Sequence, residues 1–140
     1  KMGARQLVLF DPDGARAGAL AQNLCTLFGP GRALVGADLA TAMAAASGLI
    51  HATPTGMAKY PGLPLPAALL RPAHWIAEIV YFPLETALLR AARDAGCRTL
   101  DGGGMAVHQA VDALRLFTGA EPDAARMLRD FDALVAAGGG

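Results

Sequence analysis

Three apolar runs in this chain each end in a loop rich in glycine, proline, threonine or tyrosine. They occupy residues 48–57, 80–86 and 101–110, about one strand–helix unit apart. Strand ends spaced in this way are expected to share one edge of an open parallel sheet. In such sheets ligands bind outside the carboxyl ends of the strands. The chain is therefore expected to have a ligand-binding edge, and the loop residues indicate which ligand it takes.

The pattern of apolar residues along the chain alternates between strand and helix. Strands are predicted at 7–10, 33–36, 48–53, 75–81 and 97–100. Helices are expected from Asp13 to about 28, from Asp38 to about 47, from Pro83 to about 95, from 105 to 117, and from Pro122 onward, with a short turn near 67–70. Val107, Val111, Leu114 and Phe117 should form the core-facing stripe of the fourth helix. The alternation predicts an α/β fold in which helices flank a parallel sheet.

Composition excludes several classes of function. Twelve acidic residues balance twelve basic ones, and no basic stripe of the kind that binds nucleic acid is seen. No apolar stretch is long enough to span a membrane. Cys25 and Cys97 lack metal-binding or redox spacing, so a reducing, cytoplasmic compartment is expected. No metal site, Ser-His-Asp set or carboxylate pair is apparent, and the chain contains no G-x-G-x-x-G motif.

An acidic residue directly after the first predicted strand is a candidate for binding ribose. Asp11 holds this place and Arg16 follows five residues later. In dinucleotide-binding folds such a carboxylate accepts hydrogen bonds from the adenosine ribose, and it repels the 2′-phosphate of NADP. Arg16 could instead approach a phosphate or stack on adenine. The alternative is that Asp11 and Asp13 are turn and cap residues.

Further candidates follow the later strands. The glycines at 102–104 should allow close approach to a flat ring. Gln109 lies one turn after Met105, and it either faces the ligand or is a solvated surface residue. The Tyr81 phenol either holds a substrate carboxylate or packs under the neighbouring proline.

Four segments together resemble the C-terminal half of the shikimate and quinate/shikimate dehydrogenases. They read HATPTGM at 51–57, PLPAALL at 64–70, VYFPLET at 80–86 and LDGGGMAVHQAVDALRLFTG at 100–119. The resemblance implies a Rossmann-like domain and the reversible NAD(P)-dependent reduction of 3-dehydroshikimate to shikimate, a step in aromatic amino acid biosynthesis, or the related oxidation of quinate. One departure is His51, which stands where this family usually has asparagine.

The resemblance also implies roles for individual residues. Tyr81 and Gln109 would contact the substrate. The cofactor would be bound by Asp11 and Arg16 at the adenosine ribose, by Thr53 and Pro54 along its flank, and by Ile79, Gly102 and Met105 at the nicotinamide end. Asp11 favours NAD, with NADP as the alternative.

By the same resemblance, residues 1–140 are part of an NAD(P)-binding domain that includes its C-terminal helices. The first strand, the Gly-rich loop and an N-terminal domain carrying the catalytic Lys and Asp would lie outside this chain. We therefore expect no catalytic residue here, no hydride transfer by the chain alone, and one unpaired edge on each of the strands 7–10 and 48–53. Two alternatives remain. One is a non-catalytic nucleotide- or metabolite-binding module. The other is a receiver-like domain, although the Thr and Lys that such a domain carries at its later strand ends do not line up in this sequence.

Overall fold

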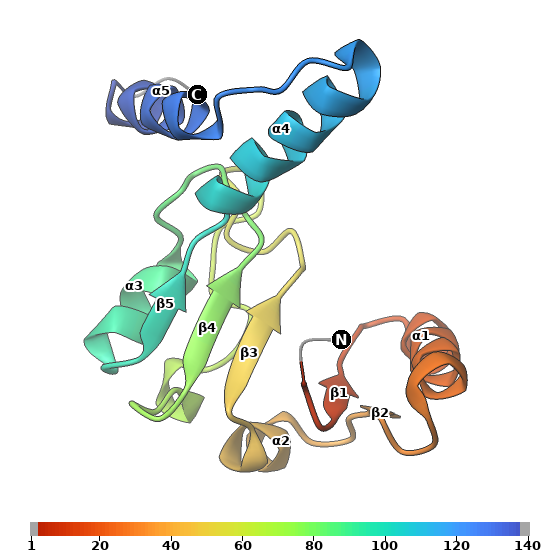
Figure 1. The fold of residues 1–140 in the computed structure, drawn as a ribbon. Helices are drawn as coiled ribbons and strands as arrows, with labels where there is room; N and C mark the ends of the chain where they lie inside the picture. Colours follow the sequence, from red (N-terminus) through yellow and green to blue (C-terminus); the bar gives the residue numbers. More distant parts are fainter. Residues whose placement is uncertain (1–2, 138–140) are drawn as a thin grey trace. The chain divides into compact units, whose positions relative to one another are not determined.

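The computed structural model describes residues 3–137, which divide after Ala45 into two compact units. The first unit contains β1 (Leu7–Leu9), α1 (Gly14–Phe28), β2 (Ala33–Val35) and α2 (Leu39–Ala45). β1 and β2 are parallel, with Leu7 opposite Ala33. The Asp13 carboxylate caps α1 by accepting the N–H groups of Ala15 and Arg16. The predicted order of elements is confirmed in this unit (Figure 1).

The second unit carries a three-stranded parallel sheet in the order β3-β4-β5. Its elements are β3 (Gly48–His51), a 3₁₀ turn η1 (Ala67–Leu69), β4 (Trp75–Glu78), α3 (Ala87–Asp94), β5 (Arg98–Leu100), α4 (Gly103–Thr118) and α5 (Ala124–Ala136). Figure 1 shows the three arrowheads pointing the same way, toward the start of α4. The carboxyl ends of three strands therefore share one edge, as the sequence predicts.

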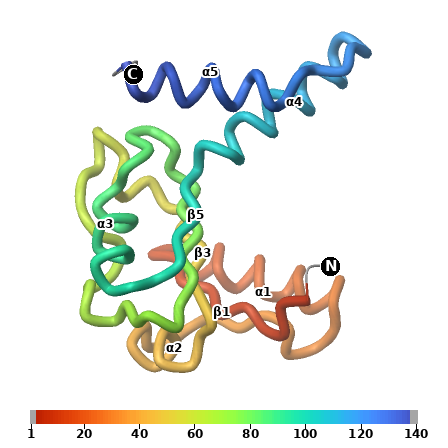
Figure 2. The backbone as a smooth tube through the Cα atoms, turned by 60° about the vertical axis from the view of Figure 1, so that its left-hand side comes forward, coloured from red at the N-terminus to blue at the C-terminus, as the bar shows by residue number. Residues whose placement is uncertain are grey.

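The core of the second unit lies between β4 and the helix α3. Ile76 on β4 is completely buried, as are Leu89 and Ala92 on α3. Val107 and Val111, on one face of α4, are also buried. This arrangement places α3 against the sheet, and α4 begins at the carboxyl edge (Figure 2).

Four strands, β1, β2, β3 and β5, have an edge without a strand partner in residues 3–137. β1 pairs with β2 alone, and β3 pairs with β4 alone. Of the four, β1 and β3 are the strands for which the sequence predicts an unpaired edge. Their N–H and C=O groups on that side are free to pair with another strand.

Some predicted boundaries are wrong. α3 begins at Ala87 instead of Pro83, because the Thr86 hydroxyl accepts the N–H of Leu89 and caps the helix there. The strands predicted to reach 53 and 81 end at His51 and Glu78. The predicted core-facing stripe of α4 is wrong in the second half of the helix, where Leu114 and Phe117 are exposed. Figure 2 shows that α4 runs well beyond the strands after its first turns.

Candidate functional site

A buried carboxylate lies at the carboxyl edge of the second sheet. Glu78, the last residue of β4, stands opposite His51, the last residue of β3, in the parallel register. The side chains of both are almost wholly buried, with 0% and 3% of their surface exposed. Glu78 Oε1 is 2.8 Å from His51 Nδ1 and 3.0 Å from the backbone nitrogen of Val80. Its other oxygen, Oε2, accepts the Thr86 hydroxyl at 3.0 Å.

The carboxylate fixes the direction of the hydrogen bond between His51 and Glu78. A carboxylate accepts, so His51 carries a proton on Nδ1 and donates it to Glu78. In the neutral imidazole, Nε2 then accepts the Thr53 hydroxyl, whose oxygen lies 2.6 Å away. Thr53 Oγ1 in turn accepts the N–H of Thr55 at 3.2 Å. No buried side-chain polar atom in residues 3–137 lacks a partner, so the network is fully satisfied.

Sequence reasoning missed Glu78. The available signal was a single carboxylate inside the apolar run 75–80, because a charged residue in a buried strand needs a partner. The sequence has His51 where the family usually has asparagine, and the structure shows which hydrogen bonds this histidine makes. The imidazole spans the gap between Glu78 and Thr53.

The structure brings two predicted cofactor residues into contact. The backbone of Gly102 lies against the carbonyl groups after β4: a Cβ atom there would be 2.9 Å from the oxygen of Ile79 and 2.7 Å from that of Val80. Any residue larger than glycine at this position would push the two strand ends apart. The ends of β4 and β5 therefore approach closely, as the predicted site requires.

The other two glycines of the 102–104 run differ from each other. A Cβ on Gly103 would lie 2.8 Å from the ring of Phe131 on α5 and 3.1 Å from Leu84. The sequence predicts that these glycines allow a flat ring to approach. At Gly103 the ring is that of Phe131, a side chain of the chain itself. Gly104 has nothing within 4 Å of that position, so it alone keeps an open face for a ligand.

The remaining residues predicted for this edge lie around it. Thr53 and Pro54 are exposed in the loop after β3, and Tyr81, half exposed, follows β4. Met105 is partly buried on the first turn of α4, and Gln109 is exposed one turn later. In residues 3–137 Tyr81 and Gln109 share no hydrogen bond.

Asp11 and Arg16 lie in the first unit and form an ion pair. Arg16 Nη1 is 3.8 Å from Asp11 Oδ2, while Asp11 Oδ1 accepts the N–H of Asp13 at 2.8 Å. Asp11 is therefore a turn residue and Asp13 a helix cap, in an arrangement that does not exclude a ligand. The arrangement leaves Oδ2 of Asp11 at the protein surface beside a guanidinium group.

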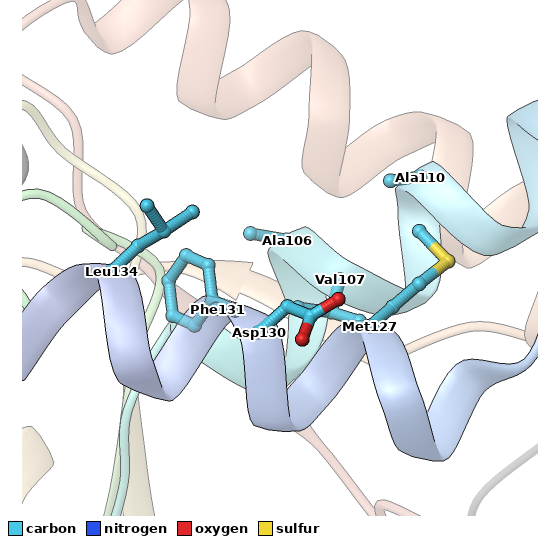
Figure 3. Close-up of a pocket in the computed structure, with 7 residues that line it drawn as sticks. All are labelled: Ala106, Val107, Ala110, Met127, Asp130, Phe131 and Leu134. Atoms are coloured by element: carbon cyan, nitrogen blue, oxygen red, sulfur yellow. The ribbon is translucent and has the colours of Figure 1, made fainter.

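A groove of about 300 Å³ lies between α4 and α5. Figure 3 shows its lining residues, which are Ala106, Val107, Ala110, Met127, Asp130, Phe131 and Leu134. None of them belongs to the predicted site, because Met105 and Gln109 occupy a different face of α4. The only charged group in the lining, Asp130, pairs with Arg126 at 3.6 Å. The groove therefore offers packing surface without reactive groups.

Residues 3–137 contain neither a metal-binding cluster nor a membrane-spanning helix. They contain no cluster of three or more His, Cys, Asp or Glu side chains able to hold a metal ion. None of their helices combines the length and apolar character needed to cross a bilayer.

Comparison with known proteins gives consistent results. Residues 102–129 match the family described as the Shikimate 5'-dehydrogenase C-terminal domain. The chain is 57% identical over 136 residues to a shikimate dehydrogenase (NADP(+)) of Streptomyces avermitilis, covering 96% of this chain and 47% of that protein. It is 50% identical to a quinate/shikimate dehydrogenase (NAD(+)) of Corynebacterium efficiens, covering 92% and 46%.

A solved structure has the same fold. The quinate dehydrogenase from Corynebacterium glutamicum in complex with NAD superposes with a TM-score of 0.86 at 45% identity, covering 94% of this chain and 48% of that one. The chain thus spans about half the length of the relatives it matches. On sequence and fold together, it belongs to the family of shikimate and quinate/shikimate dehydrogenases.

Proposed function

We propose that this chain is the cofactor-binding part of an enzyme that reversibly reduces 3-dehydroshikimate to shikimate with NAD(P)H, or oxidises quinate in the related reaction. The observation that carries the proposal is the arrangement of the strand-end motifs. The loops after β3, β4 and β5 lie at one edge, and the relatives with similar sequences are named for these reactions.

The residues at this edge suit the nicotinamide end of a dinucleotide. Gly104 leaves open space, Thr53 and Pro54 are exposed, and Gly102 holds the ends of β4 and β5 together at Ile79. Met105 completes this group at the start of α4. A bound nicotinamide supplies hydride transfer, and the chain's contribution is to orient the ring.

Substrate contacts are assigned to two polar side chains. The Tyr81 phenol can donate a hydrogen bond to a carboxylate, and the Gln109 amide can both donate and accept. Both side chains are exposed, so both are available to a ligand. The acid–base groups, a Lys and an Asp, are assigned to an N-terminal domain of the same protein. No catalytic residue is assigned within this chain.

We assign the adenosine ribose to Asp11 and Arg16, with NAD as the preferred coenzyme. The relatives include both NAD(+) and NADP(+) enzymes, so their names do not decide between the two. Asp11 does favour one of them, because its Oδ2 can accept ribose hydroxyl groups and repels a 2′-phosphate. We also assign the protein to the cytoplasm, since Cys25 and Cys97 are both free thiols.

Steady-state kinetics of the protein encoded by the complete reading frame test this function. We expect turnover of shikimate or quinate, faster with NAD than with NADP. Asp11→Asn should lower kcat/KM for NAD relative to NADP by roughly 10-fold or more, because a hydrogen bond to a charged group contributes about 1.5–3 kcal/mol. Asp38→Asn, an exposed helix cap in the same unit, is the matched control. An unchanged coenzyme ratio in Asp11→Asn would show that Asp11 does not select the coenzyme.

The competing function is a non-catalytic nucleotide- or metabolite-binding module. It predicts that the complete protein binds NAD in calorimetry yet turns over neither shikimate nor quinate. Sequence upstream of Lys1 separates the two: a Gly-rich loop preceded by a domain with Lys and Asp favours the enzyme.

A further inference from the structure

Glu78, His51, Thr53, Val80 and Thr86 form one hydrogen-bonded cluster, hereafter the Glu78 network. We propose that Glu78 is a positioning residue for the cofactor-binding edge. It holds the loop after β3, the loop after β4 and the start of α3 in one arrangement. This inference rests on the proposed function, because that function makes the two loops part of the cofactor site.

Stability alone does not account for a carboxylate at this position. The Glu78 side chain has no exposed surface and belongs to a strand whose neighbour Ile76 is also fully buried. Taking a charge out of water is costly, and a well-packed apolar residue is often as stable or more so. What an apolar side chain cannot do is accept directed hydrogen bonds. The carboxylate is therefore best explained by the partners that it fixes.

Those partners belong to three separate segments. His51 ends β3, the Val80 N–H lies in the loop after β4, and the Thr86 hydroxyl caps α3. Two of these segments adjoin residues assigned to the site: His51 holds the Thr53 hydroxyl, and Val80 stands between Ile79 and Tyr81. Since hydride transfer depends on the reacting groups being held in a narrow range of geometry, one carboxylate controls the placement of both loops.

The order carboxylate, imidazole, hydroxyl is also that of a Ser-His-Asp triad. Here the hydroxyl already has a structural use, because Thr53 Oγ1 accepts the N–H of Thr55 and closes the turn that follows β3. The geometry therefore assigns Thr53 to holding the loop, and the network to positioning.

Two variants of the complete protein separate the effects on the two loops. Glu78→Gln keeps the shape but removes the negative charge, which weakens the hydrogen bonds from His51 and Val80, so both loops should loosen. His51→Asn keeps a donor near the place of Nδ1 and is too short to reach Thr53, so only the loop after β3 should loosen. Amide hydrogen exchange, read by mass spectrometry, should rise in 52–56 and 79–82 for Glu78→Gln, and in 52–56 alone for His51→Asn.

Kinetics give the second measurement. Glu78→Gln should lower kcat/KM for the cofactor by roughly 10- to 100-fold, as loss of a supporting hydrogen bond does at metal sites. Glu85→Gln, whose carboxylate is half exposed in the same segment, should leave kcat/KM unchanged. Leu88→Ala removes a buried side chain of α3 outside the network and controls for lost stability alone.

The outcomes are distinguishable. If the wild-type protein has no turnover, the proposed function fails, and the exchange data still decide whether Glu78 holds the two loops. If Glu78→Gln loses no more activity than Leu88→Ala at equal residual stability, the positioning role is overturned. If Glu78→Gln does not fold, His51→Asn decides, and unchanged exchange in 52–56 overturns the proposal.

Discussion

Thr86 holds two hydrogen bonds that a single isosteric substitution would remove. The residue is completely buried. Its hydroxyl donates to Glu78 Oε2 at 3.0 Å and accepts the N–H of Leu89 at 3.2 Å, which caps α3. Thr86→Val keeps the shape of the side chain and loses both bonds, so the effect on stability follows from the hydroxyl alone.

The expected loss is large because the two contributions add. Loss of a helix cap costs about 1 kcal/mol. Loss of a hydrogen bond to a charged group costs roughly 1.5–3 kcal/mol. Together they predict that the free energy needed to open α3 falls by about 3 kcal/mol. Thr86→Ser keeps both bonds and removes one methyl group, which faces Gly56, so it should cost only about 1 kcal/mol.

Amide hydrogen exchange of residues 87–94 in the complete protein measures this free energy directly, since it reports local opening. Urea unfolding followed by circular dichroism provides an independent value. The reasoning is refuted if Thr86→Val differs from wild type by less than about 0.5 kcal/mol, a difference typical of surface changes. It is equally refuted if Thr86→Ser is as destabilising as Thr86→Val, because packing would then account for the whole effect.

Three further predictions concern other parts of the chain. Gly102→Ala sets a methyl group 2.7 Å from a backbone oxygen and should cost about 1–3 kcal/mol in thermal unfolding, whereas Gly104→Ala, with open space, should be neutral or slightly stabilising. Hydrogen bonds from Arg115 hold the pKa of Glu121 below its usual 4.5, so this pair should stabilise the fold above that pH and lose its contribution as the pH falls through the lowered pKa. An NMR titration in which Glu121 titrates at or above 4.5 would contradict this, and Glu121→Gln should flatten the acid dependence. The 140-residue chain alone should self-associate through β1 and β3, and strong amide protection of both strands in a monomer would disprove this.

Much of the fold could be predicted because its signals are local. The sequence predicts a helix that starts at Asp13, and the Asp13 carboxylate caps α1. Gly96 and Gly119 follow α3 and α4 with the positive φ that such a helix end needs, 74° and 69°. The start of α3 was misplaced because Pro83 is a plausible first helical residue. Thr86 supplies the actual cap, and its hydroxyl could be recognised as such only once Leu89 was placed.

The Glu78 network could not be predicted, for a different reason. His51 and Glu78 are 27 residues apart, and they meet only because β3 and β4 pair in one register. A shift of one residue would turn the two side chains to opposite faces. Likewise, periodicity finds the apolar stripe of α4 but not the point at which the rest of the chain stops covering it, and Phe117, predicted for the core, is exposed.

The division of the chain after Ala45 has a consequence for how this family diversifies. Under the proposed assignment, the acid that selects the coenzyme belongs to one unit, and the residues around the reactive ring belong to the other. Substitutions in the turn at 11–16 could then exchange one coenzyme for the other while the chemistry of hydride transfer stayed as it was. Relatives that share about half of their residues with this chain and differ in coenzyme are what such a separation would produce.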